Sequence, residues 1–415
     1  MAIAAALQIY AEKLIACLPP PNVRLEKPAI LQHEDILCMP LTSLDPRKLK
    51  LQGGLYHRQG GYIPSSGLIT NKQVVVGYGP LPLPSSAPVL SGKSLYMGLC
   101  HSHFGHFLIE TLSRLWFLQA QQIQDFDHII LLPINGCVPE FVVDLFKLLG
   151  VDERLKIIDA PFFLENVCIP SPAIEYPWKV HQVINTLQQL FADSIAVEPT
   201  EQPIFLSRNQ LVPGHFRMII GEDRLEQALE SQGVYIYHPE NYSIHHQIST
   251  LSRHKTIISF AGSALHTMLL SGGNKNVVAY SARRIPLVFP LLDKALNNKS
   301  DYVQSRRLSV NGLASLAVGF KPQLIDPRIV LRRLKQRQLI GSEVVSGYGT
   351  AAADLRECNR YNTAMLLQWV REASQVEEKM LCLEKIQQFA SKYPLDEEML
   401  AQARLGSALL RGYFS

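Results

Sequence analysis

The stretch from His101 to Trp116 places three histidines, a glutamate and an arginine in an otherwise apolar run. Four of these polar residues follow one another at steps of three, four and four, so a helix would carry them on one stripe: His103, His106, Glu110 and Arg114. Imidazole accepts protons near neutral pH, a carboxylate can orient it, and a guanidinium can balance negative charge. The stripe therefore has the chemistry for proton transfer in a cleft.

A purely structural interpretation of the stripe stays open. Glu110 and Arg114 have the spacing of an ordinary i,i+4 ion pair, and backbone groups can satisfy the histidines. However, polar side chains on a mostly buried helix need partners, and these four lie on one stripe that begins at a glycine-containing turn. We therefore expect His106 to be a general base, with Glu110 as its orienting partner or as the alternative base, and His103 and Arg114 to line the cleft.

The composition is that of a globular chain long enough for two domains. It has 415 residues, of which 47% are hydrophobic and 18% charged, and its net charge of +4 does not indicate a nucleic-acid binder. The seven cysteines are scattered and form no CxxC pair, which predicts free thiols in a reducing compartment and no structural zinc site: Cys17, Cys38, Cys100, Cys137, Cys168, Cys358 and Cys382.

The location expected from the sequence is cytoplasmic. The N-terminal run MAIAAALQIYAEKLIACLPPP lacks a positive leader and is interrupted by Glu12 and Lys13, which predicts an amphipathic helix ended by prolines. No uncharged apolar stretch reaches the roughly 18 residues of a membrane span. A basic run remains ambiguous between peripheral contact with the inner face of the membrane and a solvated helix face: Arg328, Arg332, Arg333, Lys335 and Arg337.

The elements that position the His106 stripe belong to a first α/β layer. Residues 1–93 contain many Pro, Gly and Ser signals and predict short strands and turns. Strand-like KSLYMGL, HIILLP, LKIID and NVCIP then alternate with helices expected at 101–120 and 138–150. This alternation predicts an α/β domain over 94–195.

A second series of βα units follows. Strand-like PIFLS, VYIYH, TIISF and NVVAY alternate with helices expected over 222–231, 243–253 and from 263, which predicts a parallel sheet with right-handed crossovers. Ligands of such sheets bind at the carboxyl ends of strands. Those ends carry Ser207-Arg208, Pro239-Glu240 and Ala261-Gly262-Ser263.

This edge is suited to an anion. Gly262-Ser263 leads from a buried strand directly into a helix, so backbone N–H groups and the helix dipole favour negative charge there. Arg208, together with Arg217, would balance that charge. Although a strand-Gly-helix turn alone is commonly a packing feature, the neighbouring arginine favours a diphosphate site.

Four blocks in order resemble glycosyltransferase family 61, which includes bacterial proteins of capsular polysaccharide biosynthesis. They are HFGHFLIETLSRLWFL, FLSR followed by GEDRLEQALESQGV, HPENYSIHHQI, and IISFAGSALHTMLL, within 94–282. Two positions depart from the family pattern, since Gly221 stands in place of Asn and His266-Thr267 in place of Thr-Asn. The resemblance supports these residues: Gly105, His106, Glu110, Arg114, Arg208, Arg217, Glu222, Glu240, Gln247, Gly262, Ser263 and Leu265.

The resemblance implies an α/β GT-B-like fold, in which two Rossmann-like domains face a cleft. Together with the patterns along the chain, it suggests four regions: a strand- and turn-rich region (1–93), an acceptor-side domain (94–195), a nucleotide-sugar domain (196–322) and a helical extension (323–415), of which the first and the last are not explained by the resemblance. The implied reaction is inverting and metal-independent, needs no cofactor, and uses a nucleotide-sugar donor, expected to be UDP-linked. The expected donor-binding residues are Arg208, Arg217, Glu240, Gly262, Ser263 and His266.

The expected function is therefore transfer of a sugar to a hydroxyl of a glycan or lipid-linked glycan acceptor in bacterial surface polysaccharide assembly. Two alternatives remain: a metal-dependent hydrolase that uses the cluster His101, His103 and His106, and a non-catalytic glycan-binding or scaffold protein. Asp125-Phe126-Asp127 has a DxD spelling but precedes a strand, so it predicts a polar turn. The C-terminal helices are open between packing within the subunit and a homodimer contact.

Overall fold

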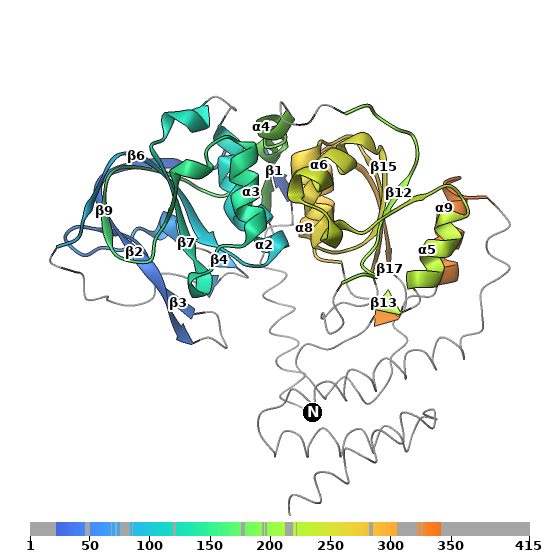
Figure 1. Cartoon of the computed structure of the whole chain (residues 1–415), viewed down its shortest axis with the longest axis horizontal. Helices are drawn as coiled ribbons and strands as arrows, with labels where there is room; N and C mark the ends of the chain where they lie inside the picture. The colour runs from blue at the N-terminus through green and yellow to red at the C-terminus, as the bar shows by residue number, and fades with distance from the viewer. Residues whose placement is uncertain are drawn as a thin grey trace, which may run out of the picture.

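The computed structural model describes residues 22–341 apart from 46–49, 68, 71–72, 75–83, 85, 119–121, 176–178, 193–194, 196, 212–218, 221, 282–284, 305–322 and 325–326. Two sheets dominate it, one in each half of the molecule (Figure 1). The predicted N-terminal helix, most of the C-terminal extension and Arg217 lie outside the described residues.

The first sheet has six strands in the order β3-β2-β9-β6-β7-β8. Its parallel part is β9 (Phe162–Pro170), β6 (Val89–Cys100), β7 (His128–Pro133) and β8 (Leu155–Ile157). Each predicted strand segment coincides with one of these strands, wholly or for most of its length, so the predictions at 93–99, 128–133, 155–159 and 166–170 are confirmed. Helix α3 (Glu140–Leu148), between β7 and β8, confirms the helix expected over 138–150.

The N-terminal region extends this sheet and does not form a unit of its own in the structure. Strand β2 (Ile30–Asp45) pairs antiparallel with β9 on one side and with β3 (Lys50–His57) on the other. It has 16 residues, which is longer than the short strands expected there. The boundary drawn at residue 93 therefore runs through a single sheet, because β2 finds its partner far along the chain.

The second sheet has the order β14-β12-β15-β16-β17, and all its neighbouring strands are parallel. The strands are β12 (Ile204–Leu206), β14 (Tyr235–Tyr237), β15 (Thr256–Phe260), β16 (Asn276–Ser281) and β17 (Lys299–Gln304). The helices after the first four are α5 (Glu222–Glu230), α6 (Ile244–Arg253), α7 (Met268–Ser271) and α8 (Val288–Ala295). The predicted parallel βα units are confirmed.

Helices of the two halves pack against each other between the sheets. Figure 1 shows α2 (Phe104–His106), α3 and α4 (Gln189–Ala192) next to α6 and α8. Contacts join α3 to α6 and α4 to α7. One hydrophobic cluster contains buried residues of both halves, such as Leu131 and Phe146 in the first and Ile248 and Ile257 in the second. The two halves therefore share a core.

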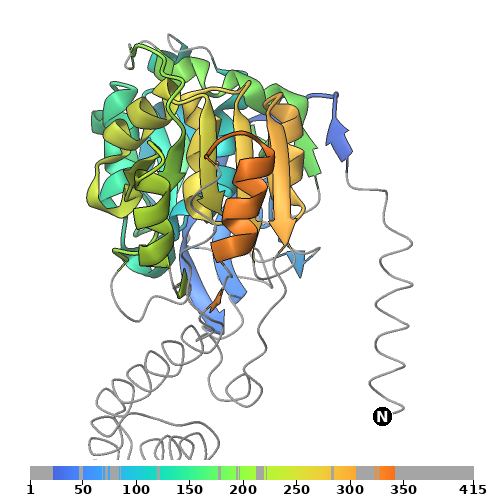
Figure 2. The ribbon, with the colours of Figure 1, turned by 90° about the vertical axis from the view of Figure 1, so that its right-hand side faces the viewer.

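The outer face of the second sheet is covered by α5 and α9 (Pro327–Gln336), as Figure 2 shows. Val330, Leu331 and Leu334 of α9 are fully buried there with Phe205 and Ile258. Helix α9 therefore completes the second half, although the sequence boundary at residue 323 assigns it to the extension. No helix among the described residues is long and apolar enough to cross a bilayer.

Short strand pairs complete the structure. A three-stranded sheet contains β1 (Asn22–Arg24), β10 (Ile174–Glu175) and β11 (Lys179–His181). Two pairs consist of β4 (Ile69–Thr70) with β5 (Gln73–Val74), and β13 (Ile219–Ile220) with β18 (Gln323–Leu324).

The four cysteines in the described part are free thiols: Cys38, Cys100, Cys137 and Cys168.

Candidate active site

The helix that follows β6 is irregular, although the sequence predicts one regular helix at 101–120. After the single turn of α2 come a π-helical turn, Phe107–Thr111, and a 3₁₀ segment, Leu112–Phe117. Changes of helix type alter the angle between successive side chains, and π-helical turns are found frequently at functional sites. The simple stripe of steps three, four and four is therefore broken in its second half.

His106 and Glu110 form a pair in the first half of this helix. His106 Nδ1 lies 2.9 Å from Glu110 Oε1, and the carboxylate side chain is 5% exposed whereas the imidazole is 34% exposed. When Nδ1 carries the proton and donates it to Glu110, the lone pair is on Nε2. The pair is thus a partly exposed imidazole oriented by a buried carboxylate.

Two further histidines hold this imidazole in place. The His101 ring stacks on the His106 ring, with centroids 4.8 Å apart and planes 22° from parallel. Burial lowers the pKa of His101, and the nearby His106 lowers it further. His103 precedes α2 and caps it, because its Nδ1 accepts the backbone N–H of His106 at 3.4 Å. His103 therefore shapes the turn that presents His106.

The histidine cluster is not arranged as a metal centre. Within the part of the chain that the structure describes, no three His, Cys, Asp or Glu side chains are placed to bind a metal ion. The His101 and His103 rings meet edge to face at a centroid distance of 6.4 Å.

Arg114 is an internal residue and does not line a cleft as expected. Its side chain is among the largest fully buried ones, with 2% of the residue exposed. Nη1 donates to the carbonyl of Pro170 at 2.5 Å, and Nη2 donates to that of Gly67 at 3.3 Å. The i,i+4 ion pair with Glu110 does not form either, since Glu110 faces His106. Arg114 instead joins the irregular helix to the end of β9.

Arg208 and Gly262 come together at the carboxyl ends of two neighbouring strands. Arg208 follows β12 and Gly262 follows β15, and these strands are paired in parallel. A Cβ atom built on Gly262 would lie 3.2 Å from Arg208 Nη1, so the guanidinium lies against the glycine backbone. The order of the sheet reverses between these strands, and doubly wound sheets bind ligands at such a point.

The turn after β15 starts a helix, although not a regular α-helix at first. Ser263–Thr267 is a 3₁₀ turn, and α7 continues directly from it. The first N–H groups of a helix have no acceptor within it, which leaves them available to an anion.

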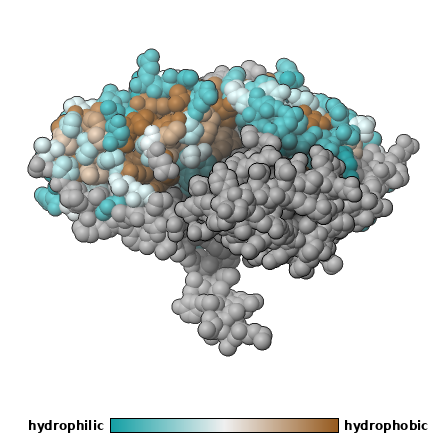
Figure 3. All heavy atoms as spheres, turned by 60° about the horizontal axis from the view of Figure 1, so that its bottom comes forward, coloured by the Kyte–Doolittle hydropathy of each residue, from teal (hydrophilic) through white to brown (hydrophobic). Residues whose placement is uncertain are grey.

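In Figure 2 the arrowhead of β17 points to the bottom of the view, so the carboxyl edge of this parallel sheet faces that way. Seen from below, the described surface of the second half is mostly hydrophilic (Figure 3).

A buried carboxyl group supports the Arg208 turn. Glu222 is 1% exposed, and its Oε1 accepts the backbone N–H of Arg208 at 2.9 Å and lies 3.2 Å from the Ser207 hydroxyl. Burial raises the pKa of Glu222 to about 8, against the opposing effect of Arg208. The Ser207 hydroxyl also contacts Glu226. The family resemblance named Glu222 and Arg208, but the sequence analysis did not predict that the carboxyl group supports the Arg208 turn; the available signal was a glutamate on the buried stripe of Leu225 and Leu229.

The two strand-to-helix turns meet at Gly105. A Cβ atom there would lie 2.9 Å from Ser263 Oγ and 3.0 Å from His266 Cδ2. His266 is 6% exposed, and its ring stacks on Phe289 at a centroid distance of 4.8 Å. His106, the next residue after Gly105, is thereby held beside the turn that begins at Gly262. The structure thus assembles residues that lie about 160 positions apart in the sequence.

The remaining predicted positions are more peripheral. Glu240 is exposed in the turn Pro239–Asn241 after β14, the strand next to β12. Gln247 supports that turn, because its amide donates to the carbonyl of Pro239 at 2.9 Å. Asp127 accepts the backbone N–H of Lys93 at 2.7 Å, in agreement with a polar turn.

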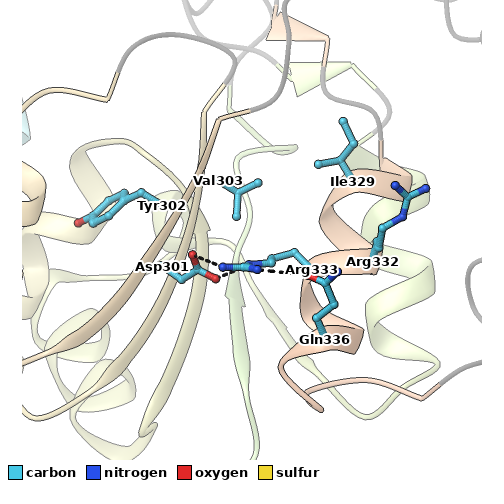
Figure 4. A pocket seen from close by; sticks show the side chains of 7 residues that line it. All are labelled: Asp301, Tyr302, Val303, Ile329, Arg332, Arg333 and Gln336. Carbon is cyan, nitrogen blue, oxygen red and sulfur yellow. Dashed lines mark hydrogen bonds and ion pairs between the residues drawn. The ribbon is translucent and has the colours of Figure 1, made fainter.

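A separate cavity of about 310 Å³ lies between β17 and α9 (Figure 4). Asp301 and Arg333 point toward each other across it, with Nε–Oδ2 and Nη2–Oδ1 distances of 2.5 and 2.9 Å. Arg337 reaches the same carboxylate, and the hydrogen bond from Arg333 keeps the pKa of Asp301 below its usual value. The cavity contains none of the predicted site residues, and the one carboxylate in it is already paired with two guanidinium groups.

A match to a protein family covers the segment that contains the His106, Arg208 and Gly262 turns. Residues 104–278 match the family described as glycosyltransferase 61. This segment is therefore similar to glycosyltransferase family 61. The protein is therefore an enzyme, a glycosyltransferase, and its substrates are a glycosyl donor and an acceptor. No curated protein matches the chain.

The glycosyltransferase 61 segment extends from α2 to β16. It includes the His106–Glu110 pair, the Arg208 turn and the Gly262 turn, but excludes β2, β3 and α9. The strands at the edge of the first sheet and the helix on the outer face of the second therefore lie outside the matched part.

Proposed function

We propose that this glycosyltransferase moves a sugar from a nucleotide-sugar donor, expected to be UDP-linked, to a hydroxyl of a glycan acceptor, with inversion and without a metal ion. One observation carries the proposal: the turn with the His106–Glu110 pair packs directly on the turn with Ser263, next to Arg208. A proton acceptor and an anion-binding turn are the two groups that such a transfer requires.

The donor side of the proposed site is the carboxyl edge of the second sheet. Arg208 and the helix start at Ser263 would face the diphosphate, and both would stabilise the charge that grows as it leaves. Glu240 follows β14, which is the neighbour of β12 in the sheet, so Glu240 would lie beyond Arg208, toward the nucleoside. Arg217 and His266 complete the proposed set, Arg217 lying outside the described residues and His266 at the contact with Gly105.

The acceptor side is the irregular helix of the first half. The acceptor hydroxyl gives its proton to His106 Nε2 while its oxygen attacks the anomeric carbon. The bond from that carbon to the diphosphate oxygen breaks, and its electron pair leaves with the diphosphate. Glu110 stabilises the imidazolium that forms. A single displacement of this kind inverts the anomeric carbon, and the protein supplies the cations that the diphosphate requires.

Two α/β halves with helices packed between them support a GT-B-like arrangement, with the reacting hydroxyl of the acceptor held by the first half and the donor held by the second. The first half differs from a simple Rossmann-like sheet, because β2 and β3 add an antiparallel edge.

The wider role that we propose is bacterial surface polysaccharide assembly of the capsular type, in the cytoplasm, with a glycan or lipid-linked glycan as acceptor. Contact with the inner face of the membrane would use α9, on which Arg332 and Lys335 are exposed. Arg333 and Arg337 contribute less, since both pair with Asp301. A homodimer is proposed through the helices that the sequence predicts beyond residue 341.

A donor panel tests the proposed reaction. Full-length protein is heated with UDP-, GDP-, CMP- and dTDP-sugars, and consumption of each donor is measured with and without glycan acceptors. A donor at a hundred times its dissociation constant should stabilise the protein by roughly 2.7 kcal/mol. The proposal would be rejected if no nucleotide sugar stabilised the protein and none was consumed.

A further inference from the structure

Two tyrosines are exposed along the seam between β14 and α6. Tyr242 is 42% exposed and Tyr235 is 37% exposed. They are the two aromatic residues among the exposed large hydrophobic side chains of the described part. Large apolar groups on the surface that lie together mark ligand or partner sites more often than scattered ones do. This seam is therefore a candidate binding surface.

The exposed rings rest on other rings. Tyr242 stacks on His246 at a centroid distance of 4.3 Å and on Tyr237 at 4.9 Å, with interplanar angles of 12° and 13°. The Tyr237 hydroxyl lies 2.9 Å from His246 Nδ1, so these two supporting rings are joined by a hydrogen bond. Tyr235 stacks on His254 at 5.6 Å and 9°. Each exposed tyrosine is thus supported on one face.

The turn that carries Tyr242 is also held in place. The Gln247 amide donates to the carbonyls of Pro239 and Tyr242 at 2.9 and 3.0 Å. Asn241 donates to the Gln210 side chain, which joins this turn to the loop after Arg208. A ring that is already ordered loses little conformational entropy when a ligand covers it. The arrangement is therefore preorganised for stacking.

We propose that the Tyr242 surface, defined as Tyr242 and Tyr235 with their supporting rings, binds sugar units of the acceptor glycan away from the reacting hydroxyl. This inference rests on the proposed glycan acceptor. A pyranose ring presents C–H groups on its faces and hydroxyls on its rim, which matches an aromatic face with polar edges. Neighbouring strands lie roughly 4.8 Å apart, and β14 is next to β12, so a glycan chain on this surface passes close to the Arg208 turn.

Affinity electrophoresis of the full chain tests the proposal without any donor. Native gels contain xylan, dextran, mannan or hyaluronan as the soluble probe, and migration of the protein is measured against polysaccharide concentration. We expect at least one polysaccharide to retard the protein. Tyr242→Ala should raise that dissociation constant about tenfold, a loss of about 1.4 kcal/mol, because the substitution removes the exposed aromatic face. Tyr242→Phe keeps the ring and should bind almost as the parent does.

Leu25→Ala is the matched control, since Leu25 is 84% exposed on another part of the surface. Its retardation should equal that of the parent, and thermal unfolding checks that every variant is folded. Tyr235→Ala provides a second variant on the same surface, with a smaller loss expected.

Three results would overturn the inference. They are the absence of retardation by all four polysaccharides, equal retardation of the parent and Tyr242→Ala, and a loss of nucleotide-sugar affinity in Tyr242→Ala. The last result would assign the ring to the nucleobase of the donor. Because the gels contain no donor, failure of the transfer reaction in the donor panel is distinguishable from failure of glycan binding.

Discussion

At the scale of single residues, the spacing of polar groups predicted a pairing but not all of its members. The step of four from His106 to Glu110 survives in the structure as a 2.9 Å contact. The next step of four does not place Arg114 on the same side, because the helix passes through a π-helical turn and a 3₁₀ segment. No simple periodicity predicts where a helix changes type, so the position of Arg114 required the structure.

His106→Ala tests the proposed base. Turnover should fall by about 10²–10⁴-fold, the usual contribution of general base catalysis, while donor affinity stays nearly unchanged. The measurement is single-turnover transfer alongside donor binding. Glu110→Gln should give a smaller loss, since it removes only the group that orients the imidazole. Normal turnover in a folded His106→Ala protein would make His106 a structural residue.

Glu222→Gln should change how stability depends on pH. The pKa of Glu222 is raised from 4.5 to about 8 in the folded protein, so the folded state holds an extra proton between these values. The stabilisation that Glu222 contributes through this proton is fully present below pH 4.5. It is lost as pH rises through 8. The slope contributed by one group is at most about 1.4 kcal/mol per pH unit.

Urea unfolding of parent and variant at pH 5, 6, 7 and 8 measures this effect. The free energy of unfolding of the parent should fall relative to that of Glu222→Gln across the series. Glu240→Gln serves as control, because Glu240 is exposed on a neighbouring turn. A constant difference between parent and variant would show that Glu222 is already ionised at pH 5.

At the scale of elements, local patterns predicted the second sheet well and the first sheet partly. Segments such as TIISF are apolar, β-branched and bounded by polar turns, and the structure places β15 there. Strand β2 was harder, because its register depends on β9, whose residues follow some 130 positions later. The local sequence of neither segment indicates that the two strands pair.

Arg208→Ala should weaken donor binding and slow transfer together. A charged hydrogen bond contributes roughly 1.5–3 kcal/mol, so the dissociation constant of the donor should rise about 10- to 100-fold. Transfer slows as well because charge grows on the leaving diphosphate. Binding and turnover are measured in the presence and absence of a chelator, and the chelator should have no effect on the parent.

Arg337→Ala is the matched control for this experiment, since Asp301 retains Arg333 as a partner. A parent enzyme inactivated by chelation and restored by a divalent metal would contradict the metal-independent proposal. Unchanged donor affinity in Arg208→Ala would remove this arginine from the donor site.

Gly105→Ala tests the contact between the two turns. The added Cβ would lie 2.9 Å from Ser263 Oγ and 3.0 Å from His266 Cδ2, so the Ser263 side chain must move or the turns must shift apart. Overpacking of this kind costs roughly 1–3 kcal/mol, and the displaced base should slow transfer more than it weakens donor binding. Gly61→Ala is the control, because its Cβ would make an ordinary contact at 3.4 Å. Parent-like stability and turnover would show that this contact is loose.

At the scale of the whole molecule, the alternation of strands and helices predicted an α/β fold, but not how its halves are joined. The domain boundaries at 93 and 322 followed changes of composition, whereas the sheets follow pairing and burial. Helix α9 is amphipathic wherever it packs, and only the burial of Val330 and Leu331 assigns it to the second sheet. The shared core between the halves explains why the proposed site forms where two separate turns meet.

That shared core predicts cooperative unfolding of the two halves. Because one hydrophobic cluster includes strands of both sheets, loss of either half would expose apolar surface of the other. Hydrogen exchange at increasing urea should therefore give the same midpoint for peptides from β6 and from β15. A nucleotide sugar at a hundred times its dissociation constant should shift both midpoints equally, by a free energy of roughly 2.7 kcal/mol. Gly61→Ala should retain the common midpoint, whereas two separated midpoints in the parent would show that the halves unfold independently and that the core between them contributes little.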